Sequence, residues 1–212
     1  MVPECELCRG RGWTVELDAG AGTARQCRCQ GERSLAERLA AAGVWEEYLH
    51  CTRDAWRGTW PAAKLAGFGV TQHLCTIFGP VWCGKTHLAT AILGEWLAAG
   101  GRGRWQEVST MLEELKDAMA TGRGGLLEQV RSGRCLLVLD GLLNEQATDW
   151  TEFVLSHILR YRHGRHLPTV ITASARDLVE LNRIAPRLSS RCAAGIVIGL
   201  TGANRRTARG VA

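Results

Sequence analysis

One eight-residue segment constrains the fold of this chain more than any other feature, because it fits the phosphate-binding loop pattern GxxxxGK[ST]. The segment consists of Gly79, Pro80, Val81, Trp82, Cys83, Gly84, Lys85 and Thr86. An apolar run at residues 74–78 precedes it, and residues 87–99, which begin with His87, have the apolar spacing of a helix. Strand, loop and helix therefore follow one another in the order that such a loop requires.

This order predicts a site for a nucleoside triphosphate. Backbone N–H groups of the loop would turn toward the β-phosphate, and the following helix would add the positive end of its dipole. Lys85 would reach the β- and γ-phosphates, and the Thr86 hydroxyl would ligate Mg²⁺. The alternative is a glycine-containing turn in an ordinary α/β domain.

A second apolar run, residues 135–140, ends in the carboxylate of Asp140. Buried parallel strands have this composition, and their C-terminal ends present polar groups at one edge of the sheet. The run follows the loop at the distance expected of a P-loop fold. We therefore expect Asp140 to hold Mg²⁺ through water, the alternative being a core strand that ends at a turn aspartate.

Length and composition indicate a compact intracellular protein. The 212 residues allow one medium domain and a small appendage, and a hydrophobic content of 46% is ample for a core. No apolar run is long enough to span a membrane, and the N-terminus has no signal-peptide character. We expect a cytoplasmic protein without a membrane partner. The net charge of +5 is too small to establish nucleic-acid binding.

Two close cysteine pairs near the N-terminus have the spacing of metal ligands. Cys5 and Cys8 form the first pair, and Cys27 and Cys29 the second. Four thiolates on two tight turns can enclose Zn²⁺ tetrahedrally, and so short a peptide would not fold unaided. We expect a zinc-binding module at residues 1–32, with a cysteine-rich disordered tail as the alternative. The other cysteines, Cys51, Cys75, Cys83, Cys135 and Cys192, are expected to be core or loop thiols.

Helical and strand patterns alternate through the rest of the chain. A helix is predicted at residues 32–42, followed by a linker whose Trp45, Trp56 and Trp60 we expect to pack on the core rather than on a partner. Later strands are predicted at residues 104–108, 168–173 and 195–200, and helices at residues 111–120, capped by Ser109, and 148–162. The alternation predicts an α/β fold with a parallel sheet and helices on both faces.

Taken together, these motifs resemble AAA+ ATPases of the DnaC/DnaI helicase-loader and IstB transposition-helper group. The resemblance spans nearly the whole chain, and it divides the chain into a zinc-like module at 1–32, a helix and Trp-rich linker at 33–61 and an AAA+ ATPase domain at 62–212. It rests on the cysteine pairs, the helix and linker, and on residues 79–89, 136–140, 148–150, 168–172 and 187–191. No clear C-terminal lid is expected.

The resemblance implies further site residues. Arg191 is the first choice for an arginine finger that reaches the γ-phosphate of a neighbouring subunit, and Arg187 is the second. Arg205 or Arg206 would occupy the sensor-2 position, and Ser174 stands where the family often has a sensor-1 asparagine.

The chain also departs from the family pattern. Gly141 stands where a second acid usually follows Asp140, so we expect slow ATP hydrolysis, with Glu145 as a weak candidate for the missing group. Trp82 replaces the usual loop glycine, where its ring would restrict the loop or cover the nucleotide.

By resemblance, the expected function is an ATP-dependent switch in DNA replication that assembles with a replicative helicase and single-stranded DNA as a nucleotide-dependent homo-oligomer. One alternative is an IstB-like transposition helper acting on duplex DNA. Another is a nucleotide-binding scaffold that no longer hydrolyses ATP, which Gly141 suggests. Arg102, Arg104 and Trp105 form a small basic and aromatic cluster that would suit DNA, but equally an ordinary turn entering a strand.

Overall fold

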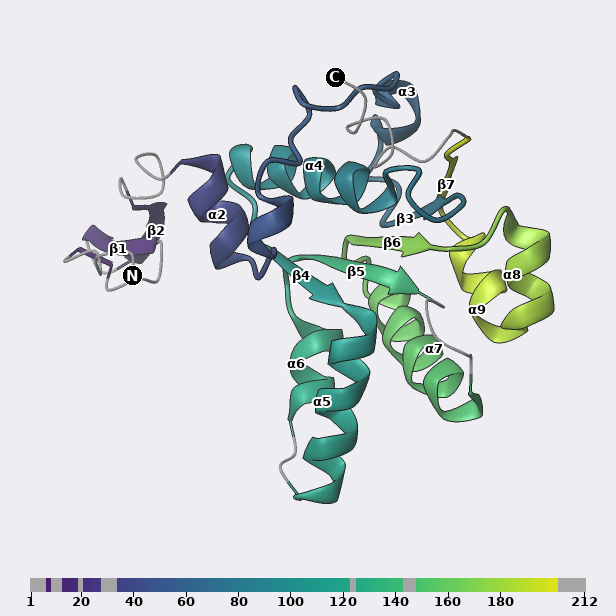
Figure 1. The fold of residues 1–212 in the computed structure, drawn as a ribbon. Helices are drawn as coiled ribbons and strands as arrows, with labels where there is room; N and C mark the ends of the chain where they lie inside the picture. The colour runs from purple at the N-terminus through teal and green to yellow at the C-terminus, as the bar shows by residue number, and fades with distance from the viewer. Residues whose placement is uncertain are drawn as a thin grey trace.

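A parallel five-stranded sheet forms the centre of the computed structural model, which describes residues 7–8, 13–18, 21–27, 34–122, 125–142 and 148–201 (Figure 1). Its strands are β3 (Leu74–Phe78), β4 (Gly103–Glu107), β5 (Leu136–Leu142), β6 (Thr169–Ala173) and β7 (Ile196–Gly199). They lie in the order β4-β5-β6-β3-β7, and every neighbouring pair is parallel. The loop after β3 therefore leaves the sheet from an interior strand, whose neighbours are β6 and β7.

Helices cover both faces of the sheet (Figure 1). On one face lie α2 (Leu35–Ala41) and α4 (Lys85–Ala98). The other face carries α5 (Val108–Ala120), α6 (Leu126–Ser132), α7 (Asp149–Gly164) and α9 (Pro186–Cys192), with α8 (Leu178–Ile184) packed beside α9. The expected α/β architecture is confirmed. No helix in the described part of the chain is both long and apolar enough to cross a membrane.

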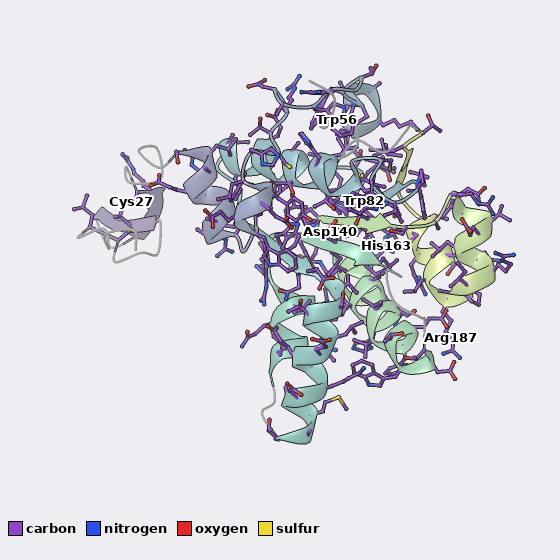
Figure 2. The ribbon with its side chains drawn as sticks, in the orientation of Figure 1. Cys27, Trp56, Trp82, Asp140, His163 and Arg187 are labelled. Atoms are coloured by element: carbon purple, nitrogen blue, oxygen red, sulfur yellow. The ribbon has the colours of Figure 1, made fainter. Side chains whose placement is uncertain are left out.

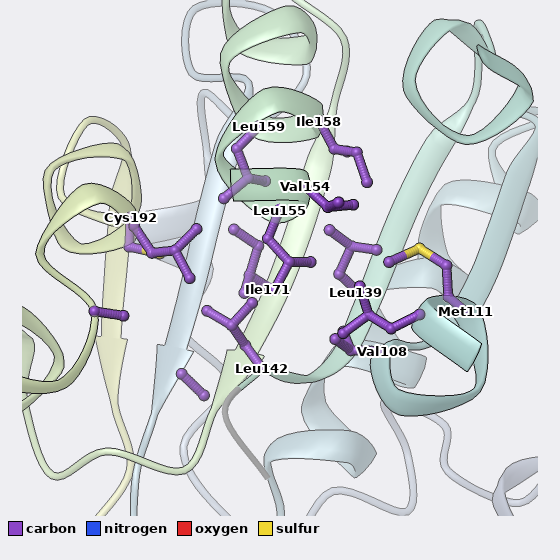
Figure 3. Close-up of a cluster of buried hydrophobic side chains, with 14 of the residues drawn as sticks. Val108, Met111, Leu139, Leu142, Val154, Leu155, Ile158, Leu159, Ile171 and Cys192 are labelled. Carbon is purple, nitrogen blue, oxygen red and sulfur yellow. The ribbon is translucent and has the colours of Figure 1, made fainter. Parts of the chain in front are cut away.

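The side chains of β5 alternate between two buried clusters, one on each face. Leu136 and Val138 belong to the cluster under α4, whereas Leu137 and Leu139 belong to the cluster under α5 and α7, part of which Figure 3 shows. Alternation along a strand places every second side chain on the same face. Asp140 therefore continues the series of Leu136 and Val138 and lies on the α4 face.

Most predicted elements agree with the structure to within a few residues. The strand predicted at 74–78 has those bounds, and those predicted at 168–173 and 195–200 each begin one residue later. The first helix begins later than predicted, because Ser34 and Glu37 form a capping box that fixes its start. Similarly, the Thr148 side chain caps α7.

The prediction that Ser109 caps the helix after β4 is wrong. The N-cap is Glu107, whose carboxylate accepts a hydrogen bond of 2.6 Å from the Thr110 N–H. Ser109 lies inside the first turn, and its hydroxyl donates to the same carboxylate. A glutamate side chain is long enough to reach back to the helix start, and sequence preferences favour shorter caps.

The two ends of the chain contain elements that the sequence patterns did not predict. An antiparallel hairpin of β1 (Trp13–Asp18) and β2 (Ala21–Gln26) lies between the two cysteine pairs. The linker includes a short 3₁₀ helix (Glu46–Tyr48), α3 (Ala62–Leu65) follows it, and the residues predicted as the arginine-finger region form α9.

Candidate nucleotide site

The phosphate loop connects β3 to α4, and its lysine is the first residue of that helix. The side chain of Lys85 is buried, and its Nζ donates to the carbonyl oxygens of Gly79 at 3.0 Å and Pro80 at 2.8 Å. The ammonium group is thus folded into the loop, where phosphate oxygens would replace the two carbonyls as acceptors. Gly84 precedes the helix with a φ of 100°, a conformation that glycine adopts without strain.

Trp82 has an unusual conformation for a large residue. Its φ is 72°, and 44% of its surface is exposed. A left-handed conformation costs a residue with a side chain about 1–2 kcal/mol relative to the right-handed one. The loop therefore stores strain at the position where glycine would relieve it.

Asp140 of β5 and Thr86 of α4 lie within hydrogen-bond distance, in the arrangement that the sequence predicted for a magnesium site. The Thr86 hydroxyl lies 3.1 Å from Oδ1 and 3.0 Å from Oδ2 of Asp140, although 54 residues separate them. Hydroxyl and carboxylate oxygens are the hard donors that Mg²⁺ takes. The donor set therefore fits this ion.

A third residue, Thr172 of β6, fixes the position of Asp140. Its hydroxyl donates to Asp140 Oδ1 at 2.7 Å and accepts from the Gly141 N–H at 2.8 Å. Because β6 lies between β3 and β5, this side chain is placed where it can brace the carboxylate that faces the loop. We did not predict this role, since Thr172 stands out from other strand threonines only once the strand order is known.

The site sets burial against charge. Burial lowers the pKa of Lys85, while the neighbouring Cys83 and Asp140 groups act to raise it. Burial also raises the pKa of Asp140, as does the charge of Glu107, whereas hydrogen bonds from Thr172 and Thr86 and the charge of Lys85 lower it. Burial disfavours the charged forms of both Lys85 and Asp140. Negative phosphate oxygens near Lys85 and a cation near Asp140 would favour those charged forms.

The linker packs against the start of α4. Nε2 of His87 lies 3.1 Å from the Thr52 carbonyl oxygen, and the Trp56 ring is edge-on to the His87 ring, with centroids 5.4 Å apart. The expected packing of the linker tryptophans on the core is confirmed for Trp56 and Trp60. Trp45 packs edge-on against the buried Trp105, with ring centroids 5.3 Å apart, although 47% of its surface is exposed.

The structure does not bring every predicted site residue to the loop. Arg187 and Arg191 lie on α9, and the Arg187 backbone N–H donates to Glu152 Oε1 at 2.7 Å. Figure 2 shows Arg187 apart from Trp82 and Asp140. Ser174 follows β6, and its N–H faces the Leu142 carbonyl at 3.5 Å. Glu145, Arg205 and Arg206 lie outside the described residues.

The predicted zinc ligands are described only in part. Cys8 and Cys27 are buried, whereas Cys5 and Cys29 lie outside the described residues. Within the residues that the structure does describe, no group of three or more histidine, cysteine or acidic side chains could hold a metal ion. The remaining cysteines are buried or, for Cys135, partly buried, as expected of core or loop thiols.

Comparison with known proteins gives structural matches only. No protein-family model matches the sequence, and no curated protein matches it significantly. The structure is similar to that of the replication initiator DnaA bound to AMPPCP and single-stranded DNA, with a TM-score of 0.62 and 20% identity over 76% of this chain. This match spans 52% of the DnaA chain, about half its length.

Two smaller proteins match over nearly their full length. The DnaC helicase loader has a TM-score of 0.56 and 24% identity, covering 73% of this chain and 99% of DnaC. DnaI has a TM-score of 0.60 and 22% identity, covering 74% of this chain and 95% of DnaI. The chain therefore has the AAA+ P-loop fold of these proteins, which the sequence resemblance predicted.

Proposed function

We propose that this chain is an ATP-binding switch that acts as a replicative helicase loader. The observation that carries the proposal is the juxtaposition of Lys85, Thr86 and Asp140, which supplies a phosphate-binding cation and two oxygen donors at one loop. The fold shared with DnaA, DnaC and DnaI supports the replication role. The proposed domains remain a module at 1–32, a linker at 33–61 and an ATPase domain at 62–212.

The residues of the loop divide the work of holding a triphosphate. The Lys85 ammonium exchanges its two carbonyl acceptors for β- and γ-phosphate oxygens. Thr86 and, through water, Asp140 would hold Mg²⁺, which when bound neutralises charge on the phosphates. Arg191 would act in trans, a role that suits its place on α9 away from this chain's own loop. Ser174, Arg187, Arg205 and Arg206 remain proposed contacts of the γ-phosphate region.

A lysine pair tests this proposal. Lys85→Ala should weaken ATP binding at least tenfold, because it removes charge-assisted hydrogen bonds worth about 1.5–3 kcal/mol. Lys116→Ala is the matched control, since Lys116 is an exposed lysine of α5. The measurements are titration with a fluorescent ATP analogue, and light scattering of mixtures with a candidate replicative helicase, with and without ATP. Equal ATP-dependent assembly by the two variants would contradict the proposal.

A groove along the edge strand β4 is the proposed contact for single-stranded DNA. It has a volume of about 670 Å³, and its lining includes Arg102, Arg104, Arg134, Trp45 and Trp105. No ion pair between described residues involves these three arginines. Unpaired cations beside an exposed aromatic ring suit a phosphate backbone with a base stacked on the ring. Preference for duplex DNA would instead favour the transposition helper.

We also propose that Cys5, Cys8, Cys27 and Cys29 hold Zn²⁺. The hairpin register pairs Trp13 with Gln26, so the two strand ends that lie nearest to Cys8 and Cys27 in the sequence are side by side. The two buried cysteine side chains, Cys8 and Cys27, provide the soft sulfur donors that zinc takes. Metal analysis of the purified chain should find about one zinc per chain, lost in the Cys8→Ser Cys27→Ser double variant and retained in Cys135→Ser.

A further inference from the structure

Position 141 is occupied by a glycine whose backbone conformation disfavours any side chain. Gly141 has a φ of 85°, and β5 departs from regular pairing with β6 between Leu139 and Leu142. Its N–H is held by Thr172. Any side chain here would be placed on a left-handed backbone, at a cost of about 1–2 kcal/mol. If the chain hydrolyses ATP, the group that orients the attacking water comes from elsewhere.

Glu107 is an acid at the end of the neighbouring strand β4, beside Asp140. In the β4–β5 register Glu107 pairs with Asp140, and two residues earlier Trp105 pairs with Val138. Trp105 and Val138 share the cluster on the α4 face. Since alternate residues share a face, Glu107 lies beside Asp140 on the face that carries the phosphate loop. Its charge acts on Asp140, whose pKa it raises.

The Glu107 carboxylate is held in place and charged. It accepts hydrogen bonds from the Ser109 hydroxyl and the Thr110 N–H, one on each oxygen. Burial acts to raise the pKa of Glu107, but hydrogen bonds from the side chains and the backbone N–H groups of Ser109 and Thr110 outweigh it and lower the pKa below the ordinary value. The side chain is partly exposed and therefore accessible to water.

We propose that Glu107 supplies the second carboxylate of the hydrolytic site and orients the attacking water, an inference that rests on the proposed ATPase function. The water oxygen forms a bond to the γ-phosphorus, and the bond from that phosphorus to the bridging oxygen breaks. The bridging oxygen leaves on ADP, inorganic phosphate forms, and the water proton passes to Glu107 and then to solvent. In this chain the second acid would then stand on β4, at Glu107, instead of following Asp140 on β5, where Gly141 stands.

Two substitutions separate this role from helix capping. Glu107→Gln keeps an oxygen that can accept from Thr110, and Glu107→Ser introduces a preferred N-cap residue, yet neither has a carboxylate. Both should lower ATP turnover by about 100-fold or more, the contribution expected of a general base. Their affinity for the fluorescent ATP analogue and their thermal midpoints should stay close to those of Glu113→Gln, which removes an exposed acid of α5.

The outcomes distinguish this inference from the function on which it rests. The inference holds only if both variants lose turnover while retaining ATP affinity and thermal stability. Turnover that survives in either variant, or that is lost in Glu145→Gln instead, overturns it and leaves the ATPase proposal standing. Wild-type protein that binds ATP without hydrolysing it overturns both hydrolysis and this inference, but not nucleotide binding.

Discussion

The hydroxyl of Thr172 donates to Asp140 Oδ1 at 2.7 Å and at the same time accepts from the N–H of Gly141 at 2.8 Å. One small side chain thus satisfies both the acid and the backbone of the residue that follows it. Thr172 is fully buried and Asp140 nearly so, so water cannot readily replace either bond. The carboxylate is therefore positioned before any ligand arrives.

Replacing Thr172 by valine should disturb both bonds while preserving shape. A buried N–H and a buried carboxylate would each lose a partner, which costs about 1–3 kcal/mol of unfolding free energy per group. Affinity for Mg²⁺-ATP should fall as well, because Asp140 is no longer fixed. Urea unfolding and nucleotide titration measure the two effects, with Thr172→Ser as the control that keeps the hydroxyl. A valine variant as stable as the serine variant would contradict this account.

Backbone strain at Trp82 can be isolated by comparing two small replacements. Trp82→Ala removes the ring but keeps a side chain at a φ of 72°, whereas Trp82→Gly also removes the strain. The glycine variant should be the more stable by about 1 kcal/mol, despite the usual entropic cost of glycine. Urea unfolding without nucleotide tests this difference. An alanine variant of equal or greater stability would show that the loop is not strained there.

Arg162 connects the C-terminal end of α7 to three other segments from a fully buried position. Burial lowers its pKa to about 10, so it is charged at neutral pH. It has no carboxylate partner among the described residues, and its guanidinium donates to the Thr169 hydroxyl and to the carbonyls of Val130, Arg131, Gly133, Cys135 and Pro168.

Arg162→Met should therefore destabilise the fold by about 3 kcal/mol or more, since several buried acceptors lose their donor together. Arg162→Lys should recover only part of the loss, because an ammonium lacks the planar fork of donors. The measurement is the free energy of urea unfolding. An exposed arginine, in Arg160→Met, provides the control and should change it by less than about 0.5 kcal/mol.

Acid should weaken the fold through His73, which precedes β3. Burial lowers its pKa below 6.5, and the charges of His166 and His163 lower it further. The rings of His73 and His166 lie 4.9 Å apart. Because the native state binds fewer protons than the unfolded chain, stability is complete above the unfolded pKa and falls as pH drops through it toward the lower native value.

The urea midpoint should accordingly be lower at about pH 5.5 than at about pH 7.5. His73→Asn should reduce this difference, and it leaves intact the backbone bond from the Thr169 N–H to the His73 carbonyl. A pH dependence that is the same in the variant and the wild type would assign the effect to other groups.

If the groove beside β4 binds single-stranded DNA, its arginines should contribute to the salt dependence of DNA affinity. Each of Arg102→Gln, Arg104→Gln and Arg134→Gln should reduce the slope of log affinity against log salt by about 0.7 for single-stranded DNA, if that arginine neutralises one phosphate. Trp45→Ala should weaken DNA binding by about 1–3 kcal/mol and leave the salt slope nearly unchanged. Fluorescence anisotropy of a labelled oligonucleotide at several salt concentrations measures both. Unchanged slopes in all three arginine variants would exclude the groove.

Local sequence patterns were sufficient for the phosphate loop and for the strands next to it. The pattern GxxxxGK[ST] combines a turn, a cation and a hydroxyl in adjacent positions, so the chemistry is readable without the fold. The strand at Leu74–Phe78 is apolar throughout because both of its faces are buried, which makes its bounds sharp.

Features that depend on strand order could not be predicted from the sequence. Glu107 and Asp140 are 33 positions apart, and only the β4–β5 register brings them together. Thr172 likewise gains its role because β6 lies between β3 and β5. The misassigned cap at Ser109 has a different cause, since preference tables rank serine over glutamate, while here the longer side chain reaches the helix start.

The contact between His87 and Thr52 links the start of α4 to the linker. His87 lies two residues beyond the lysine that would grip the phosphates, and Nε2 meets a carbonyl of the linker at 3.1 Å. A rotation of the first turn of α4 would push or pull that carbonyl directly. The linker in turn leads back along the chain to α2, which also packs on α4. A movement of α4 on nucleotide binding would therefore reach the linker at two points, through His87 and through the ion pair between Arg53 and Glu95.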